Sequence, residues 1–285
     1  MIRMVLNLPT TIMIAISALA AGSPQALARD TEPRPSSETK SISIGIISSS
    51  ERDHASLGLG FVARPDYEGS DDYQAQITPL IDVKYAPLII KGTRVGIAVL
   101  ELKHPKAGLH ILAGPLAQYR TGRDEGDNNA LQGLGNIDDS IEVGGFMEII
   151  VGNWATDISV GQDVASGHDG LLATLAAKYT TPALNGIRYS YGLSTNWADG
   201  DYMQNYFGVS NAQSETSVYA PYTADAGFKD AGMELGAFYN VSAHWGVEAH
   251  VGYRRLFNDA ADSPLVKGAG SANQYQTLIG LSYNF

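Results

Sequence analysis

The sequence has no cysteine, few charged residues and, beyond its first segment, no long apolar run. The absence of cysteine excludes disulfide bonds, thiolate metal ligands, thiol catalysis and lipid attachment at cysteine. Charged residues make up 17% of the chain, against about 25% in an ordinary soluble protein. The net charge of −11 argues against nucleic-acid binding, which needs a basic surface. With 31 glycines, 15 tyrosines and a mean hydropathy of −0.08, this chain of 285 residues has apolar surface that is dispersed along it.

The first residues have the organisation of an export signal. Arg3 supplies a positive charge, residues 12–21 form an apolar run, and the Ala-Leu-Ala at 26–28 offers small residues to a signal peptidase. A transmembrane helix is the alternative, but the run is shorter than the roughly 18–20 residues that a bilayer requires. We therefore expect a cleaved signal peptide at residues 1–28, followed by a polar leader at 29–55.

The rest of the chain alternates between apolar and polar residues. In the segment 245–256, Trp245 and Val251 occupy one set of alternate positions, and Glu248 and His250 occupy the other. A period of two places successive side chains on opposite faces of a β-strand. The same pattern, in places weaker, predicts further strands at residues 56–63, 74–85, 88–91, 94–101, 108–120, 141–151, 154–164, 171–179, 187–197, 230–240 and 274–285.

The connections between these strands alternate in length. They are long at 121–139, 198–228 and 257–273, and short at 152–153 and 241–244. Outer-membrane barrels have short turns on the periplasmic side and long loops outside. Strands of about ten to twelve residues rise ~33–40 Å, and at a tilt near 45° they cross an apolar band of ~25 Å. We therefore predict an all-β fold, a transmembrane antiparallel up-and-down β-barrel of about 12 strands over residues 56–285, in the bacterial outer membrane.

Three features fit this prediction poorly. Residues 41–48 (SISIGIIS) alternate as well, and they are compatible with an extra strand, a segment tucked into the barrel or a replacement for another strand. Pro79 and Pro115 lie inside predicted strands, where each lacks the N–H that a ladder bond needs. These features bear on the number of strands.

Four ordered groups of residues carry a family resemblance. They are Pro-Asp-Tyr-Glu-Gly-Ser-Asp-Asp-Tyr at 65–73, Gly-Arg-Asp-Glu at 122–125, Trp-Ala-Asp at 197–199 and Asp-Ala-Ala-Asp-Ser-Pro at 259–264. Together they resemble the MltA-interacting protein (MipA/OmpV) outer-membrane family. The resemblance implies a barrel without a catalytic motif. For the founding type it implies a scaffold that holds a lytic murein transglycosylase near a penicillin-binding protein, and other members are described as surface proteins or adhesins.

The predicted outer loops are rich in carboxylates. Oxygen ligands of this kind suit divalent cations, and their charge disfavours anionic permeants. The plainer interpretation, which we favour, is a solvated loop surface, because no EF-hand spacing is present. We expect no resident metal and no cofactor. The candidate residues are Asp66, Glu68, Asp71, Asp72, Asp124, Glu125, Asp127, Asp138 and Asp139.

A second polar set is predicted to face the lumen. The favoured interpretation is a network of opposite charges that fills a narrow lumen. A water-filled pore is an alternative, and so is a hydrolase that uses His250 with Glu248 and a serine, although no particular serine stands out. The set comprises Glu142, Glu148, Lys178, Arg188, Glu234, Glu248, His250 and Arg254.

Two loop segments have simpler interpretations. Residues 201–208 fit a short amphipathic helix on the outer rim or an ordinary packed loop equally well, and His168–Asp169 fits a turn better than a ligand pair. The sequence as a whole favours a non-enzymatic binding or scaffolding barrel, with a small porin, a surface adhesin and a hydrolase as alternatives. Its expected partners are outer-membrane lipid and, from the resemblance, a lytic murein transglycosylase and a penicillin-binding protein, with no nucleic acid.

Overall fold

The computed structural model describes residues 53–285. The predicted signal peptide, most of the predicted leader and the segment 41–48 lie outside the described residues. The first strand begins at His54, so it includes the last residues assigned to the leader. The described residues form the strands β1 His54–Pro65, β2 Tyr73–Tyr85, β3 Leu88–Lys91, β4 Arg94–Ile97, β5 Leu100–His104, β6 Leu109–Arg120, β7 Ser140–Val151, β8 Trp154–Asp163, β9 Leu171–Thr180, β10 Ile187–Ala198, β11 Gly227–Asn240, β12 Trp245–Leu256 and β13 Asn273–Asn284.

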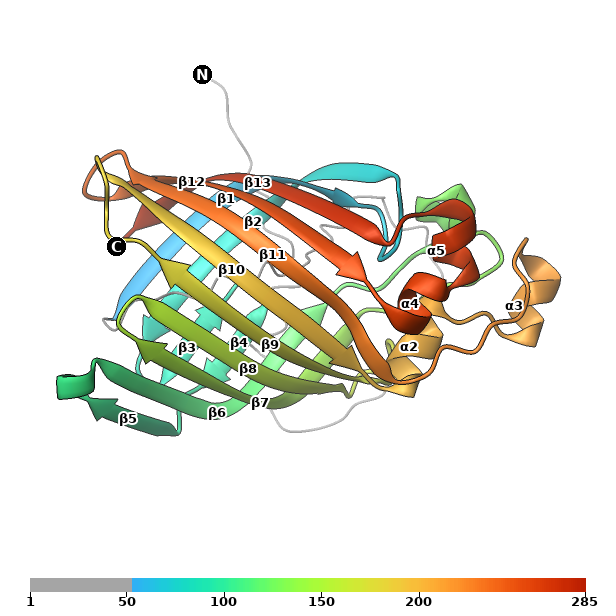
Figure 1. Ribbon diagram of the computed structural model, residues 1–285, viewed down its shortest axis with the longest axis horizontal. Coiled ribbons are helices and arrows are strands. Elements are labelled where there is room, and N and C mark those ends of the chain that lie inside the picture. The colour runs from blue at the N-terminus through green and yellow to red at the C-terminus, as the bar shows by residue number, and fades with distance from the viewer. Residues whose placement is uncertain (1–52) are drawn as a thin grey trace, which may run out of the picture. The chain divides into compact units, whose positions relative to one another are not determined.

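These strands close into one antiparallel barrel (Figure 1). Consecutive strands pair with each other except β4 and β5, β13 pairs back with β1, and β4 pairs with β6 to close the ring. β4 and β5 pair with successive parts of β6, so together they occupy one position in the wall. The barrel therefore has 12 positions, and the predicted fold class is confirmed.

The outer surface of the wall is apolar. Leu59 is 59% exposed, Phe61 56% and Ile279 68%, and these side chains alternate with the small or polar residues of the lumen. An outward apolar band of this kind meets lipid in a transmembrane barrel. None of the helices in residues 53–285 is long and apolar enough to cross a membrane.

The two ends of the barrel differ. At the short-turn end the strands are joined by brief turns and by η1 (Pro105–Ala107), whereas the long loops gather at the opposite, long-loop end (Figure 1). Residues 200–207 form a helix, which decides between the two interpretations of that segment. Its N-cap is Asp199, which accepts a hydrogen bond from the amide of Tyr202. The long loops contain η2 Glu125–Asp127, η3 Asn129–Leu131, α2 Gly200–Phe207, α3 Asn211–Thr216, α4 Asn258–Asp262 and α5 Pro264–Ala269.

Both prolines lie where the missing N–H breaks no regular ladder. The amide of Gly92 donates to the carbonyl of Ile81, so odd-numbered residues of β2 direct their backbone polar groups away from β1. The nitrogen of Pro79 therefore points away from β1. On that side β2 pairs with β3 from Asp82 to Tyr85, and none of the described strands pairs with it at Pro79. Pro115 lies opposite the break between β4 and β5, where the register changes. Edges and bulges are where sheets tolerate proline.

Glycines on the lumen face make room for large neighbours. A Cβ on Gly96 would lie 2.8 Å from the ring of Phe146, and a Cβ on Gly236 would lie 3.0 Å from Nδ1 of His250. Both glycines are thus required by the close approach of a side chain from another strand, β7 for Gly96 and the adjacent β12 for Gly236. The high glycine content of the chain follows in part from this packing inside the wall.

Candidate functional site in the lumen and its cap

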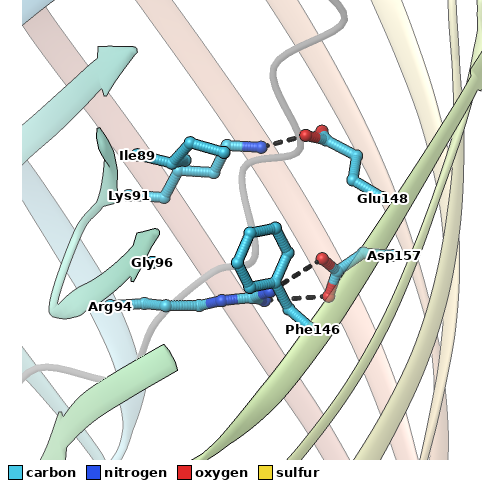
Figure 2. Close-up of a pocket in the computed structure, with 7 residues that line it drawn as sticks. All are labelled: Ile89, Lys91, Arg94, Gly96, Phe146, Glu148 and Asp157. Carbon is cyan, nitrogen blue, oxygen red and sulfur yellow. Dashed lines mark hydrogen bonds and ion pairs between the residues drawn. The ribbon is translucent and has the colours of Figure 1, made fainter. Parts of the chain in front are cut away.

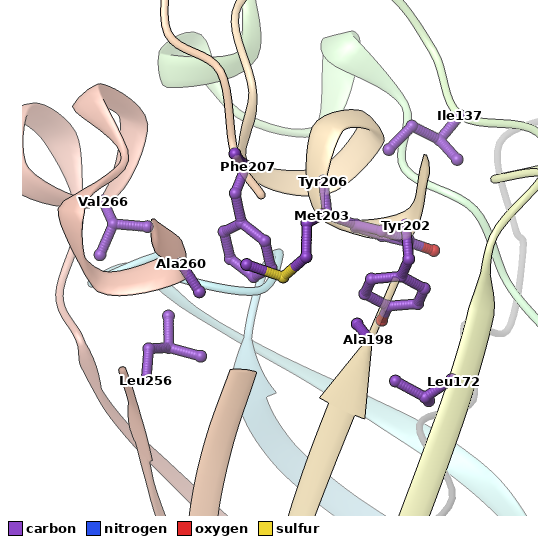
Figure 3. Close-up of a cluster of buried hydrophobic side chains, with 11 residues drawn as sticks. Ile137, Leu172, Ala198, Tyr202, Met203, Tyr206, Phe207, Leu256, Ala260 and Val266 are labelled. Atoms are coloured by element: carbon purple, nitrogen blue, oxygen red, sulfur yellow. The ribbon is translucent and has the colours of Figure 1, made fainter. Parts of the chain in front are cut away.

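The long loops pack into a cap, formed by residues 66–72, 121–139, 199–226 and 257–272, with its own apolar core. Helix α2 contributes Tyr202, Met203 and Phe207, all fully buried (Figure 3). They pack against residues of β12, α4 and α5, including Leu256 and Val266. A second buried cluster consists of Tyr67, Leu131, Leu134, Val209, Tyr219 and Leu265. The largest apolar clusters of the described chain therefore lie at one end of the barrel.

A buried ion pair joins the cap to the wall. Lys229 Nζ lies 2.9 and 2.8 Å from the two carboxylate oxygens of Glu68 in the first loop. The same amine lies 2.9 Å from Asp230 Oδ2. Burial opposes the ionisation of Glu68, but the charge and hydrogen bonds of Lys229 outweigh it and lower the pKa of Glu68. A charged Glu68 of the cap is thus held against Lys229 of the wall.

A bulge in β11 makes this contact possible. Asn196 of β10 pairs with Asp230, and the next residue, Trp197, pairs with Phe228, so Lys229 is skipped in the register. A β-bulge of this kind redirects one side chain and lets two consecutive residues point inward. Strict alternation would have placed Lys229 on the lipid face. The sequence carries no visible sign of the bulge, and the lysine was therefore missed as a candidate.

Asp230 is the centre of a second set of contacts. It accepts a hydrogen bond from Nδ2 of Asn196 at 2.7 Å, and Arg254 Nε lies 3.5 Å away. Thr174 donates in turn to Asn196 at 2.7 Å. The predicted lumen residue Arg254 thus faces a carboxylate on the neighbouring strand, as a charge-balanced lumen requires.

A third set links the wall to α2. Arg120 Nε lies 2.5 Å from Glu142 Oε1, and Nε2 of the fully buried His168 lies 3.0 Å from the same oxygen. The His168 ring meets Tyr202 edge-on at 4.8 Å. The segment around His168 is a turn, as expected, and Asp169 has a φ of 55°. The side chain of His168 nevertheless belongs to the network, which the sequence interpretation missed.

Several of the predicted loop carboxylates accept hydrogen bonds within the cap. Asn128 Nδ2 donates to Asp66 at 3.0 Å and to Asp72 at 3.1 Å, so it ties the loop 121–139 to the loop 66–72. Glu125 accepts from the amides of Gly133 and Gly135 at 3.1 and 3.0 Å. These carboxylates hold loops in shape.

The predicted loop carboxylates differ in their hydrogen bonds and in their exposure. Asp124 accepts from the amide of Gly126 at 2.8 Å, and Asp139 accepts from the hydroxyl of Tyr119 at 2.6 Å. No group of three or more His, Asp or Glu side chains within residues 53–285 is arranged to hold a metal ion. Within the predicted set, Asp66, Glu68 and Glu125 are partly buried; the exposed members are Asp71, Asp72, Asp124, Asp127, Asp138 and Asp139.

Nearer the short-turn end, His250 lies between two carboxylates. Its Nδ1 is 3.2 Å from Glu234 and its Nε2 is 2.9 Å from Glu248. Ser190 lies across Gly236 from His250, and its buried hydroxyl has no hydrogen-bond partner in the described structure. A serine hydrolase needs one imidazole nitrogen to take the serine proton. Because both nitrogens face carboxylates, this geometry suits charge balance better than base catalysis.

Two further ion pairs cross the lumen from the β3–β4 hairpin (Figure 2). Lys91 Nζ lies 2.9 Å from Glu148, and Arg94 makes two bonds of 2.9 and 3.0 Å to Asp157. The guanidinium also lies 5.2 Å from the ring centre of Phe146. These side chains, with Ile89 and Gly96, line a small cavity behind the hairpin.

The structure thus brings most of the predicted lumen residues into opposite-charge contacts. His250 contacts Glu234 and Glu248 from the predicted set. The other paired members, Glu142, Glu148 and Arg254, contact residues outside that set. Lys178 is buried, and Arg188 is exposed near Phe238, with its guanidinium carbon 6.0 Å from the ring centre. Alternation along the strands, applied to every charged residue, would have found Lys91, Arg94 and Asp157. The contact between Glu68 and Lys229 cannot be predicted from alternation, because the two residues are 161 positions apart in the sequence.

Comparison with known proteins identifies a family over the barrel. The family model of the MltA-interacting protein MipA matches residues 57–285. The MltA-interacting proteins of Escherichia coli (strain K12) and Shigella flexneri are each 27% identical over 127 residues. That match covers 43% of this chain and 48% of each relative, so the aligned part spans about half the length of the curated relatives.

Two solved structures resemble the chain at low TM-scores. The outer-membrane expressed OmpT of Vibrio cholerae aligns with a TM-score of 0.36 and 9% identity, over 82% of this chain and 97% of its own. The translocator domain of the autotransporter NalP from Neisseria meningitidis aligns with a TM-score of 0.38 and 10% identity, over 81% and 87%. The fold assignment itself rests on the strand pairing of this chain.

Proposed function

The chain belongs to the MltA-interacting protein MipA family, and we propose that it is an outer-membrane barrel that binds a lytic murein transglycosylase without itself catalysing a reaction. The observation that carries this proposal is the family match, which spans residues 57–285 and includes every strand beyond the beginning of β1. The name of the relatives specifies the interaction. A penicillin-binding protein is the second partner in this proposal, recruited through the transglycosylase.

The proposed orientation places the short-turn end in the periplasm, where short turns of outer-membrane barrels lie. A signal peptide at residues 1–28 directs export in this proposal. The partner then has to bind the short turns or the polypeptide before β1. At the short-turn end, Leu184 is 66% exposed and Val241 59% exposed, so both offer apolar contact surface in water.

Co-purification from an envelope extract tests the proposal. The full chain should retain a lytic murein transglycosylase, and Leu184→Asp should reduce its retention. Val218→Asp is the matched control, since Val218 is 91% exposed but lies at the long-loop end, so we expect no change. If no enzyme of murein metabolism co-purifies with the full chain, the scaffold proposal is wrong.

The proposed absence of catalysis has its own test. The full chain, folded in detergent micelles, is assayed with ester and peptide substrates, and His250→Ala serves as the control for the cluster of His250, Glu234 and Glu248. We expect no turnover from either protein. An activity that disappears in His250→Ala would contradict the proposal and favour the hydrolase alternative.

A further inference from the structure

His168 differs from the other histidines of the chain in its place in the fold. It is fully buried at the long-loop end, in the turn between β8 and β9. Histidine is the side chain whose charge ordinarily changes between pH 5 and 8. His168 is therefore the histidine through which the cap can respond to pH in that range. The other five, which lie nearer the short-turn end, are His54, His104, His110, His244 and His250.

The contacts of the His168 ring fix the position of its single proton. Its Nδ1 accepts a hydrogen bond from the amide of Gly170 at 3.1 Å. A backbone amide can only donate, so Nδ1 carries no proton. The proton therefore lies on Nε2, which donates to Oε1 of Glu142 at 3.0 Å. The closed cap thus holds the imidazole in its neutral form.

A second proton on this ring conflicts with the shape of the turn. It places an N–H of His168 against the N–H of Gly170, so that two donors meet without an acceptor. Unsatisfied donors cost free energy in a buried position, so the turn has to move when the proton binds. A state in which the turn has moved leaves Nδ1 open to water and binds the proton more tightly. Acid therefore favours that state.

The groups that face the ring do not remove this conflict. Glu142 on β7 attracts an imidazolium, but both of its oxygens already accept hydrogen bonds from Arg120 on β6. From α2, the ring of Tyr202 lies edge-on at 4.8 Å and that of Tyr206 lies 5.9 Å away. Burial raises the pKa of both tyrosines, so they stay neutral. Asp163, at the end of β8, accepts hydrogen bonds from the amides of residues 165, 167, 168 and 169.

The turn is tied to the helix that fills the cap. The carbonyl of His168 accepts a hydrogen bond from Nδ2 of Asn205 in α2 at 2.8 Å. Gly170 lies against the start of α2, where a Cβ on it would be 2.7 Å from a carboxylate oxygen of the N-cap Asp199. Asp169, the other carboxylate of this turn, is exposed. Because α2 supplies fully buried side chains to the cap (Figure 3), a shift of the turn loosens the apolar core.

We propose that His168 is a proton-operated latch: the cap is closed while its imidazole is neutral and opens transiently when the imidazole takes up a second proton. Each opening admits small water-soluble molecules from the long-loop side. The response lies between pH 5 and 8. It is separate from the protonation of Glu68, whose pKa lies below 4.5. It needs no protein partner, so it is independent of the proposed scaffold role.

Thiol accessibility in the core of the cap tests the latch. The sequence has no cysteine, so Met203→Cys places a single reporter at a fully buried position of α2 in the full chain. Val218→Cys is the reference, at a position of the same end that is 91% exposed. The ratio of the two modification rates removes the pH dependence of the thiol itself. With a membrane-impermeant thiol reagent and the chain in phosphatidylcholine vesicles, we expect this ratio to be about tenfold higher at about pH 5.5 than at about pH 8.

Two histidine variants of the reporter chains assign the response to one residue. His168→Gln keeps a donor for Glu142 but has no group that takes up a proton in this range, so its ratio should no longer depend on pH. His104→Gln changes an exposed histidine of β5 and should respond like the parent chain.

The parent chain alone decides the first question, even if a variant fails to fold. A parent ratio that does not change with pH would overturn the proposal. So would an undiminished response in His168→Gln, or a response that is lost in His104→Gln instead.

Discussion

The two ends of the barrel are built on opposite plans. The segments between strands at the long-loop end hold more than half of the 30 acidic residues of the chain, with Arg123 and Lys267 as their basic residues. They also contain α2 to α5 and the apolar clusters of the cap. The turns at the short-turn end contain no acidic residue, and Lys106 is their basic one.

This difference separates two tasks. The long-loop end buries apolar side chains and fixes its charges in place, so it closes the barrel. The short-turn end leaves Leu184 and Val241 exposed, and a small apolar cluster of Ile150 and Ala155 lies near it, so we place the proposed partner contact there. Changes at the long-loop end should therefore affect stability, whereas changes at the short-turn end should affect binding.

The largest effect should come from removing the cation beneath the cap. Lys229→Met leaves Glu68 and Asp230 without their shared partner, and breaking a buried pair from one side costs about 3–5 kcal/mol. The measurement is the free energy of unfolding in detergent, from urea titration followed by tryptophan fluorescence. Lys267→Met is the matched control, because its partner Asp262 and Lys267 itself are both exposed. An exposed pair contributes about 1 kcal/mol or less, and equal losses in the two variants would contradict the account.

Acid should weaken the same contact to a smaller extent. The pKa of Glu68 lies below its ordinary value of 4.5 in the folded chain. A carboxyl group with a lowered pKa contributes stability that is present above the unfolded value and is lost as the pH falls through the folded one. We therefore expect the unfolding free energy to decrease as the pH falls below 4.5. In Glu68→Gln this decrease should be smaller than in the wild-type chain. An identical acid dependence in the variant would exclude this role for Glu68.

A single hydroxyl in the cap should matter less. Tyr67 donates to the carbonyl of Ala269 at 2.8 Å and so joins the first loop to α5. Loss of this bond in Tyr67→Phe should cost about 0.5–1.5 kcal/mol of unfolding free energy. Burial, with the nearby Tyr219, raises the pKa of Tyr67 to about 12. The wild-type chain should therefore lose stability as the pH rises from 10 towards 12, and Tyr67→Phe should lose less over that range.

The smallest effect on stability should come from the opposite end. Leu184→Ala removes an exposed apolar side chain, so the unfolding free energy should change by no more than about 0.5 kcal/mol. Retention of the proposed transglycosylase should fall in the same variant. A stability loss comparable to that of Lys229→Met would mean that the short-turn end is a structural element like the cap.

The sequence predicts the wall far better than the cap. Alternation in segments such as 245–256 identifies strands because the lipid face and the lumen face impose a period of two on each strand separately. The strand Leu88–Lys91 has the predicted bounds, and the segment 94–101 was predicted as one strand but is broken at residues 98–99 into β4 and β5. That break cannot be seen in the pattern, because a bulge shifts the register without changing the residue types.

Charged residues in loops have no comparable rule. The sequence suggests that Glu68 belongs to a solvated acidic surface, and its nearest charged neighbours in the chain are also acidic. Its actual partner, Lys229, is brought to it by barrel closure and by a bulge. Likewise, the residues around His168 indicate a turn, whereas its side chain is buried and contacts Glu142. Contacts set by closure are therefore visible only once the ring of strands is known.

Conductance of the full chain in planar lipid bilayers tests most directly the claim that one end is closed. We expect no steady open current from the wild-type chain, because the cap fills the long-loop end with buried side chains. Lys229→Met should produce more frequent openings as the cap loosens. A steady open current through the wild-type chain would contradict the closed cap and favour a small porin instead.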